Sequence, residues 1–338
     1  MEYILAAGVV LIALFFVFSN GFHDGSSVLA TMISSHALRP RYALIVGAVS
    51  EFFGALFIGR GVAKTVGQGI LNPELISIWV IFSALMGAIS WNFFTWWRGL
   101  PSSSFQALVG GLLGAAIMEI FLIGGEIWQV IHWHSVILVL LVLFTSPFIG
   151  LFLGFGFTKL TFILSRGASP KINEFFRRSQ ILSSFFLGLS HASNDAPKTM
   201  GVIVMSLTVL KIYHFPENAF IVPLWVVVIC AVGISLGISR GGWRIMKTLG
   251  ARLYKIRPIH GFGAQITSSF VICLSSLTGF PVSTTQIVNS SIMGAGAADR
   301  PKAIRWNVIR EILISWLLTL PGAGIIAVMF YLFIYWLR

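Results

Sequence analysis

The chain has 338 residues, of which 57% are hydrophobic and 10% charged. A soluble domain is typically about 45–50% apolar and about 25% charged, so these values and a mean hydropathy of +0.90 exclude an ordinary soluble protein and indicate a membrane protein. The net charge of +12 would suggest a nucleic-acid partner in a soluble chain. Here the positions of the basic residues, described below, explain the charge without nucleic acid.

Seven apolar runs are long enough, at about 17 residues or more, to cross a bilayer as helices. No basic segment or small-residue cleavage site accompanies the first run, so we interpret it as a retained span and not as a signal peptide. In chain order the runs are 3–19, 42–59, 76–97, 135–158, 219–239, 259–278 and 307–335.

Four further apolar runs are interrupted or short. Polar clusters interrupt runs 21–36 and 181–210, and the short runs 101–118 and 281–296 carry Pro, Gly and hydroxyl residues. Irregular backbone at membrane depth has to line protein or water. The two short runs are therefore predicted to be re-entrant helical hairpins, within an all-α polytopic membrane protein that has broken helices.

Basic residues gather on one side of the membrane when the predicted spans are counted. Of the 23 Lys and Arg residues, 18 fall on that side, four (Arg60, Lys64, Lys211 and Arg338) fall on the other, and Lys198 lies within a span. The rich side is expected to be cytoplasmic. This predicts a multi-pass protein of the cell membrane whose two termini are both extracytoplasmic.

Two polar motifs occur twice in the same order. Gly99-Leu-Pro-Ser-Ser-Ser-Phe-Gln106 corresponds to Gly279-Phe-Pro-Val-Ser-Thr-Thr-Gln286, with six of 18 positions identical over 99–116 and 279–296. The second pair is Asn20-Gly-Phe-His-Asp24 and His191-Ala-Ser-Asn-Asp195. The two pairs have similar offsets along the chain, 180 and 171 residues. Two matches in one order predict an internal duplication.

The duplicated halves are predicted to have opposite topology. By the charge count, the turn after the first aspartate motif is cytoplasmic and the turn after the second is outside. Inverted repeats with broken helices are typical of secondary transporters. We therefore expect a first inverted repeat at 1–158, a basic cytoplasmic linker at 159–180 and a second inverted repeat at 181–338.

Asp24 and Asp195 are the acidic members of the first motif pair. A carboxylate deep in a span costs several kcal/mol unless it is paired, solvated or bound to a cation. Oxygen-bearing residues surround each one, and hard cations such as Na⁺ prefer oxygen ligands. We interpret the pair as a cation or proton site, with a helix cap or an interhelical hydrogen bond as the alternative. The neighbouring oxygen-bearing residues are Asn20, Ser26, Ser27, Ser193 and Asn194.

The Pro-Ser/Thr segments of the other pair are typical of helix N-termini. Pro in the first turn with Ser or Thr around it favours a helix start, and such an end presents free N–H groups and a positive dipole to an oxyanion. Two facing ends would hold a tetrahedral anion without a buried Arg. Plain helix capping is the alternative.

Four other polar residues lie within apolar runs. Glu51 is a candidate to take a proton or help bind Na⁺, or else to form a buried pair. Lys198 is interpreted as a side chain that reaches toward the interface, with attraction of an anion as the alternative. His23 and His191 flank the aspartates, and proton transfer and a structural hydrogen bond both remain open for them.

Enzyme motifs are absent from the sequence. It contains no G-x-S-x-G, H-E-x-x-H or P-loop pattern. We therefore predict that the protein is not an enzyme and does not hydrolyse ATP.

At these motifs the sequence resembles the inorganic phosphate transporter (PiT) family. Asn20-Gly-Phe-His-Asp24, Ser190-His-Ala-Ser-Asn-Asp195 and Gly279-Phe-Pro-Val-Ser-Thr-Thr285 carry the resemblance, in the family's order. It implies a homodimeric symporter that moves phosphate with Na⁺ or H⁺ and has no cofactor or metal beyond a bound Na⁺. The implied phosphate-binding residues are Ser103, Ser104, Ser283, Thr284, Thr285, Asp24, Asp195 and Asn194. The implied coupling-cation residues are Asp24, Asp195, Asn20, Asn194 and Glu51.

The chain departs from the family at a few positions. Ser27 stands where the family commonly has Asn, Gln265 where the second repeat usually has Glu, and Gln286 where His is common, with Gln106 at the matching place of the first repeat. These changes bear on the coupling ion more than on the oxyanion. The alternatives are a sulfate or other oxyanion permease of the same fold, and a passive anion channel.

Overall fold

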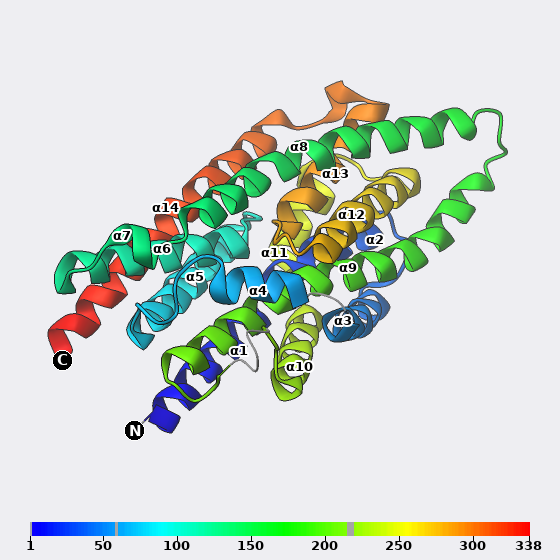
Figure 1. Ribbon diagram of the computed structural model, residues 1–338. Helices are drawn as coiled ribbons and strands as arrows, with labels where there is room; N and C mark the ends of the chain where they lie inside the picture. Colours follow the sequence, from blue (N-terminus) through cyan, green and yellow to red (C-terminus); the bar gives the residue numbers. More distant parts are fainter. Residues whose placement is uncertain (1, 58–59, 215–219) are drawn as a thin grey trace.

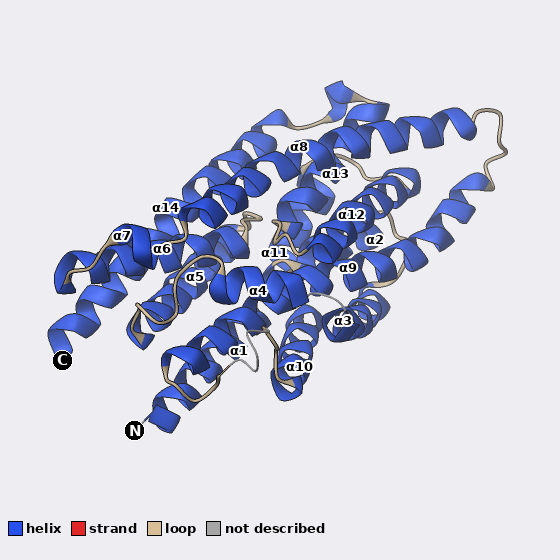
Figure 2. Ribbon diagram, viewed as in Figure 1, coloured by secondary structure: helices blue, strands red, loops and turns tan. Residues whose placement is uncertain are grey.

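The structure, a computed structural model, describes residues 2–57, 60–214 and 220–338 (Figure 1). Within these ranges every regular element is a helix (Figure 2), which confirms the predicted all-α class. Residues 58–59 of the predicted run 42–59 and residue 219 of the run 219–239 lie outside the described residues.

The helices alternate with short connections along the chain. Those of the first half are α1 (Glu2–His23), α2 (Gly25–Ser34), α3 (Pro40–Phe57), α4 (Arg60–Gln68), α5 (Ile78–Arg98), α6 (Ser104–Ile123), α7 (Ile127–Val130) and α8 (Trp133–Leu164). Those of the second half are α9 (Ile172–Val209), α10 (Leu224–Arg240), α11 (Trp243–Lys247), the π-helical η2 (Thr248–Arg252), α12 (Pro258–Thr278), α13 (Thr284–Asp299), the 3₁₀ turn η3 (Pro301–Ala303) and α14 (Trp306–Leu337).

Six of the described helical segments are long and apolar enough to cross a membrane, or eight if each of two bent pairs is one span. The six are Glu2–Ser34, Ile78–Arg98, Ser104–Ile123, Trp133–Leu164, Pro258–Thr278 and Trp306–Leu337. The bent pairs are α3 with α4 and α10 with α11 and η2. The chain is thus a multi-pass membrane protein. α6 is longer than the short run predicted at 101–118.

Apolar side chains cover the outside of the long helices α8 and α14. Phe148 and Phe152 on α8 are 61% and 69% exposed, and Met329 and Phe333 on α14 are 64% and 63% exposed. Soluble monomers rarely expose continuous apolar faces of this kind. The two faces are suited to lipid.

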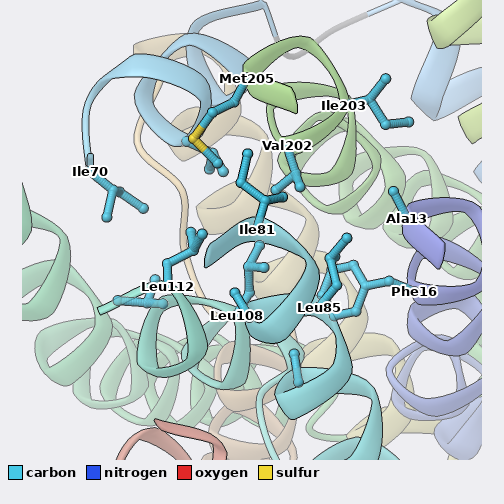
Figure 3. Close-up of a cluster of buried hydrophobic side chains, with 14 of the residues drawn as sticks. Ala13, Phe16, Ile70, Ile81, Leu85, Leu108, Leu112, Val202, Ile203 and Met205 are labelled. Atoms are coloured by element: carbon cyan, nitrogen blue, oxygen red, sulfur yellow. The ribbon is translucent and has the colours of Figure 1, made fainter. Parts of the chain in front are cut away.

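A buried apolar core joins the first half to α9. Ile81 and Leu85 of α5 and Leu108 and Leu112 of α6 lie together with Val202 of α9 (Figure 3). These side chains are fully buried, and their contacts pack α5 and α6 together against α9.

The helix ends that flank residues 99–103 and 279–283 are built alike. α5 and α12 end at Gly99 and Gly279, whose φ angles of 69° and 78° favour glycine. Ser103 and Ser283 then cap α6 and α13, each accepting a hydrogen bond from the N–H three residues on. Pro101 and Pro281 therefore precede α6 and α13, whereas the sequence pattern placed each proline in the first turn of its helix.

Contacts between the halves occur in matched pairs. Thr65 of α4 donates to the Gly279 carbonyl at 3.0 Å, and Thr248 of η2 donates to the Gly99 carbonyl at 2.8 Å. α6 packs against α14 and α13 packs against α8. Both chain ends lie at one end of the molecule, and the connection 165–171 between α8 and α9 lies at the other (Figure 1). Most of the predicted linker 159–180 is helical.

Two glycines make a further matched pair. Gly54 of α3 lies against the backbone of Leu189, and Gly237 of α10 lies against the backbone of Phe18. Leu189 and Phe18 are 171 residues apart, the same offset as the two aspartate motifs. A side chain at either glycine would meet the neighbouring carbonyl.

The two turns meet in the middle of the molecule. The Gln286 side chain donates from Nε2 to Gln106 Oε1 at 3.1 Å, so the N-terminal ends of α6 and α13 touch through corresponding residues. Residues 101–106 and 281–286 are all buried. A turn at a membrane surface would be exposed, so these turns lie inside the protein.

Candidate functional site

Asp24 lies at the break between α1 and α2. Its N–H donates to the Asn20 carbonyl at 2.7 Å, and α2 begins at the next residue, Gly25. The side chain is 2% exposed, and its Oδ1 lies 2.6 Å from Nδ1 of His23. The predicted runs 3–19 and 21–36 are thus one helical segment, Glu2–Ser34, which only Asp24 interrupts.

His23 connects Asp24 to the buried turn 99–103. Its Nε2 lies 3.2 Å from Thr95 Oγ1, and Thr95 and Ser102 hydroxyls are 2.8 Å apart. A neutral imidazole has one donor and one acceptor, so this chain of contacts fixes the ring through both nitrogens. Of the two readings left open for His23, the contacts favour a structural hydrogen bond.

Two oxygen atoms beside Asp24 have no hydrogen-bond partner. They are Asn20 Oδ1 and Ser27 Oγ, which are buried one turn before and one turn after the carboxylate. Ser26 differs, because its hydroxyl donates to the Phe22 carbonyl at 2.9 Å. Buried polar groups without partners are rare in proteins, so this face of the first span is suited to a cation that binds oxygen ligands or to a hydrogen-bond donor.

Asp195 lies in a continuous helix. The interruption predicted within 181–210 is absent: α9 runs unbroken through the motif, with Pro197 inside it. The polar side chains find tertiary partners, so the helix has no need to unwind. Asp195 is 1% exposed, its Oδ1 lies 2.5 Å from Lys198 Nζ, and its Oδ2 accepts from Thr284 Oγ1 at 3.0 Å.

Lys198 is buried, which contradicts its interpretation as a side chain that reaches the interface. It is 1% exposed, and besides Asp195 it donates to the Val282 carbonyl at 2.7 Å. A carboxylate one turn away and a carbonyl from the buried turn satisfy the ammonium group inside the protein. A long flexible side chain near such partners has no reason to extend outward.

Glu51 of α3 reaches the same cluster through His191. Glu51 Oε1 lies 2.8 Å from His191 Nδ1, and His191 Nε2 lies 3.2 Å from Asp195 Oδ2. The distances suit ion pairs, but the ring nitrogens and both Glu51 oxygens make no aligned hydrogen bond. His191 thus stands between two buried carboxylates. The structure brings together Glu51 and Asp195, which the sequence placed in different halves.

Asn194 holds the turn before α13. Its amide donates to Ser276 Oγ and to the Phe280 carbonyl, both at 3.2 Å, and its Oδ1 accepts from the Val282 N–H at 3.1 Å. These bonds fix the segment whose carbonyl contacts Lys198. The side chain therefore orders the site through the backbone.

The hydroxyl groups at the N-terminal ends of α6 and α13 differ in whether they already have a hydrogen-bond partner. Ser103 and Ser283 accept from their own helices, which leaves each hydroxyl hydrogen free to donate. Ser104 Oγ and Thr285 Oγ1 are buried without partners. Thr284 donates to Asp195, so the acid and the helix end are directly joined.

Gln265 has a tertiary role away from this cluster. Ser183 donates to its Oε1 at 2.5 Å, and its Nε2 donates to Thr31 at 2.9 Å. These bonds tie α12 to α9 and α2.

Sequence reasoning missed several members of the site. Thr95, Ser102 and Phe105 join it from the first half, and Val282 joins it through its carbonyl. Of these, Ser102, Phe105 and Val282 lie within motifs that were already singled out, so their positions carried a signal. Among the described residues, no group of three or more His, Cys, Asp or Glu side chains is placed to hold a metal ion.

Comparisons with known proteins identify the family of this chain. The chain matches the phosphate transporter family over residues 20–171 and 164–327. It is 38% identical over 328 residues to a probable low-affinity inorganic phosphate transporter of Rhizobium meliloti (strain 1021), covering 97% of this chain and 96% of that protein. A protein of the same description from Bacillus subtilis (strain 168) is 38% identical over 322 residues, covering 94% and 93%.

A solved structure has the same fold. It is described as the sodium-dependent phosphate transporter, superposes with a TM-score of 0.86 at 22% sequence identity, and is matched over 99% of this chain and 100% of that chain.

Proposed function

Since this chain belongs to the phosphate transporter family, and is a transporter and not an enzyme, we propose that it is a symporter that moves inorganic phosphate together with Na⁺ or H⁺. One observation carries the proposal: two capped helix N-termini meet at buried turns, with a buried aspartate motif beside each turn. This arrangement supplies both an oxyanion site and a cation site.

Phosphate would bind between the starts of α6 and α13. The N–H groups and dipoles of two helix ends favour an oxyanion, and the unpartnered hydroxyls of Ser104 and Thr285 are available as donors. Phosphate also carries a proton that it can donate, and Asp24 and Asp195 offer carboxylate acceptors. Sulfate has no such proton at neutral pH, so these acids favour phosphate.

The coupling cation would bind beside Asp24. Its carboxylate and the free oxygens of Asn20 and Ser27 suit the hard ion Na⁺, and the carboxylate alone suits a proton. Glu51 pairs with His191, which also pairs with Asp195. Through these contacts Glu51 would connect the charge of Asp195 to the transport cycle.

Phosphate would cross the membrane by alternating access, in which two inverted repeats move against each other around the binding site. The matched contacts of Thr65 with Gly279 and of Thr248 with Gly99 support such a pseudo-twofold arrangement. The burial of both turns supports re-entrant hairpins, because each hairpin then ends at the substrate. A cell-membrane location with cytoplasmic basic loops, extracytoplasmic termini and a homodimer remain predictions from the sequence.

Uptake into proteoliposomes tests the proposal. Purified protein should accumulate radiolabelled phosphate when an inward Na⁺ gradient or an inward proton gradient is imposed, and should stop when that gradient is collapsed. Applying the two gradients separately identifies the ion. Uptake of sulfate but not of phosphate would support the alternative of a sulfate or other oxyanion permease. Phosphate flux that does not depend on either gradient would support a passive channel.

A further inference from the structure

The ammonium group of Lys198 has the surroundings of a bound cation. It contacts the Asp195 carboxylate and the Val282 carbonyl, and it lies 4.7 Å from the centre of the Phe105 ring. A carboxylate, a carbonyl oxygen and an aromatic face each favour positive charge. With the side chain 1% exposed, bulk water does not compete for these groups.

The first half has the same carboxylate without such a side chain. Three residues after Asp195 comes Lys198, and three residues after Asp24 comes Ser27. In the described parts of the chain, no Lys or Arg lies within ion-pair range of Asp24, which pairs with His23 alone. Of the two carboxylates at corresponding positions, therefore, only Asp195 has a Lys or Arg side chain as its partner.

The position of Lys198 also matters for movement between the halves. Phe105 is the second residue of α6, and Val282 lies in the turn before α13. The ammonium group is thus placed between the two helix ends where the proposed function puts the substrate. A cation at this place neutralises Asp195 in every turnover without being carried across.

We propose that Lys198 is a tethered cation, which occupies at Asp195 the place that a co-transported cation would otherwise take. The inference rests on the proposed function as a cation-coupled transporter. It specifies that the mobile Na⁺ or H⁺ binds on the Asp24 side only, because a second cation at Asp195 would be repelled by the fixed ammonium group. Lys198 therefore sets the number of ions that move with each phosphate.

The variant Lys198→Gln tests this assignment, with Lys198→Arg as the matched control that keeps the charge. In proteoliposomes with an inward gradient of about tenfold in the driving ion, one additional coupled ion raises the limiting phosphate accumulation about tenfold. That increase is expected for Lys198→Gln and not for Lys198→Arg. An unchanged accumulation ratio with weaker apparent phosphate affinity would overturn the proposal, since Lys198 would then act on the substrate.

A binding measurement keeps the test decisive if Lys198→Gln does not transport. Equilibrium binding of radiolabelled Na⁺, and proton uptake on a pH titration, are measured on the purified full-length protein after gel filtration confirms that it is folded. Lys198→Gln should bind one more Na⁺ per chain than the parent, or one more proton once the proton of the parent's Lys198 ammonium group is left out of the count, and Asp195→Asn/Lys198→Gln should lose that ion. No additional ion in Lys198→Gln overturns the proposal.

The same measurements separate this inference from the proposed function. If the parent protein fails to accumulate phosphate under either gradient, the proposed function fails. Ion binding to Lys198→Gln still decides whether Lys198 stands in place of a cation.

Discussion

Replacing Asp195 by Asn should destabilise the protein far more than replacing Asp24 by Asn. In Asp195→Asn the buried ammonium group of Lys198 loses its counter-charge, because an amide oxygen, the Val282 carbonyl and the Phe105 ring carry no full negative charge. Removing one partner of a buried pair costs about 3–5 kcal/mol. In a large chain each kcal/mol lost from the free energy of unfolding lowers the melting temperature by about 2 °C, so the melting temperature should fall by roughly 6–10 °C.

Asp24→Asn is the matched comparison. His23 can remain hydrogen-bonded to an amide, so the expected loss is at most about 1.5 kcal/mol, the net value of one hydrogen bond. Thermal unfolding in one detergent, followed by intrinsic fluorescence, compares the two variants directly. The double variant Asp195→Asn/Lys198→Gln should recover most of the lost stability. Equal melting temperatures for the two single variants would refute the reasoning, because the Asp195–Lys198 pair would then contribute no more than the Asp24–His23 contact.

Three further outcomes are expected. Thr285→Val and Ser104→Ala should each raise the apparent KM for phosphate roughly tenfold or more, because each removes an unpartnered hydroxyl donor at a helix end; saturation curves of phosphate uptake that match the parent would move the substrate elsewhere. Glu51→Gln should reduce the maximal uptake rate with little change in that KM, since Glu51 contacts Asp195 through His191 and not the helix ends; a rate equal to that of the parent would exclude it from the cycle. Gly54→Ala should lower stability by about 1–3 kcal/mol, because the added methyl meets the Leu189 backbone. Gly8→Ala, which meets nothing within 4 Å, is its control, and equal melting of the two would show that α3 and α9 are not in close contact.

Local patterns predicted the elements and the motif positions well. Long apolar runs became helices because burial in lipid or protein leaves the backbone no other partner. Asp24 lies at a break, and Ser103 and Ser283 cap helices, since capping depends on residues within one turn of each other. The motif alignment put Gln106 and Gln286 at matching places, and the expected facing of the two helix ends agrees with their contact, although the contact itself was not predicted.

The errors came from partners that are distant in the sequence. Lys198 looked like an interfacial residue because its second partner, Val282, lies 84 positions away. The break predicted in α9 is missing because Asn194 bonds to the turn before α13, Asp195 bonds to Thr284 at the start of α13, and the helix backbone stays intact. The contact of Glu51 with His191 requires α3 to pack on α9, which no pattern within either segment predicts.

The hydrogen bond between Gln106 and Gln286 has a direction, although the two residues correspond. One amide donates and the other accepts, and the Gln286 carbonyl oxygen remains without a partner. Exchanging donor and acceptor would give a bond of equal strength between the same two side chains. The N-terminal ends of α6 and α13 are therefore joined by a hydrogen bond that has two arrangements of equal energy. If the two repeats alternate between two opposite orientations, as proposed, this hydrogen bond has the same strength in either one.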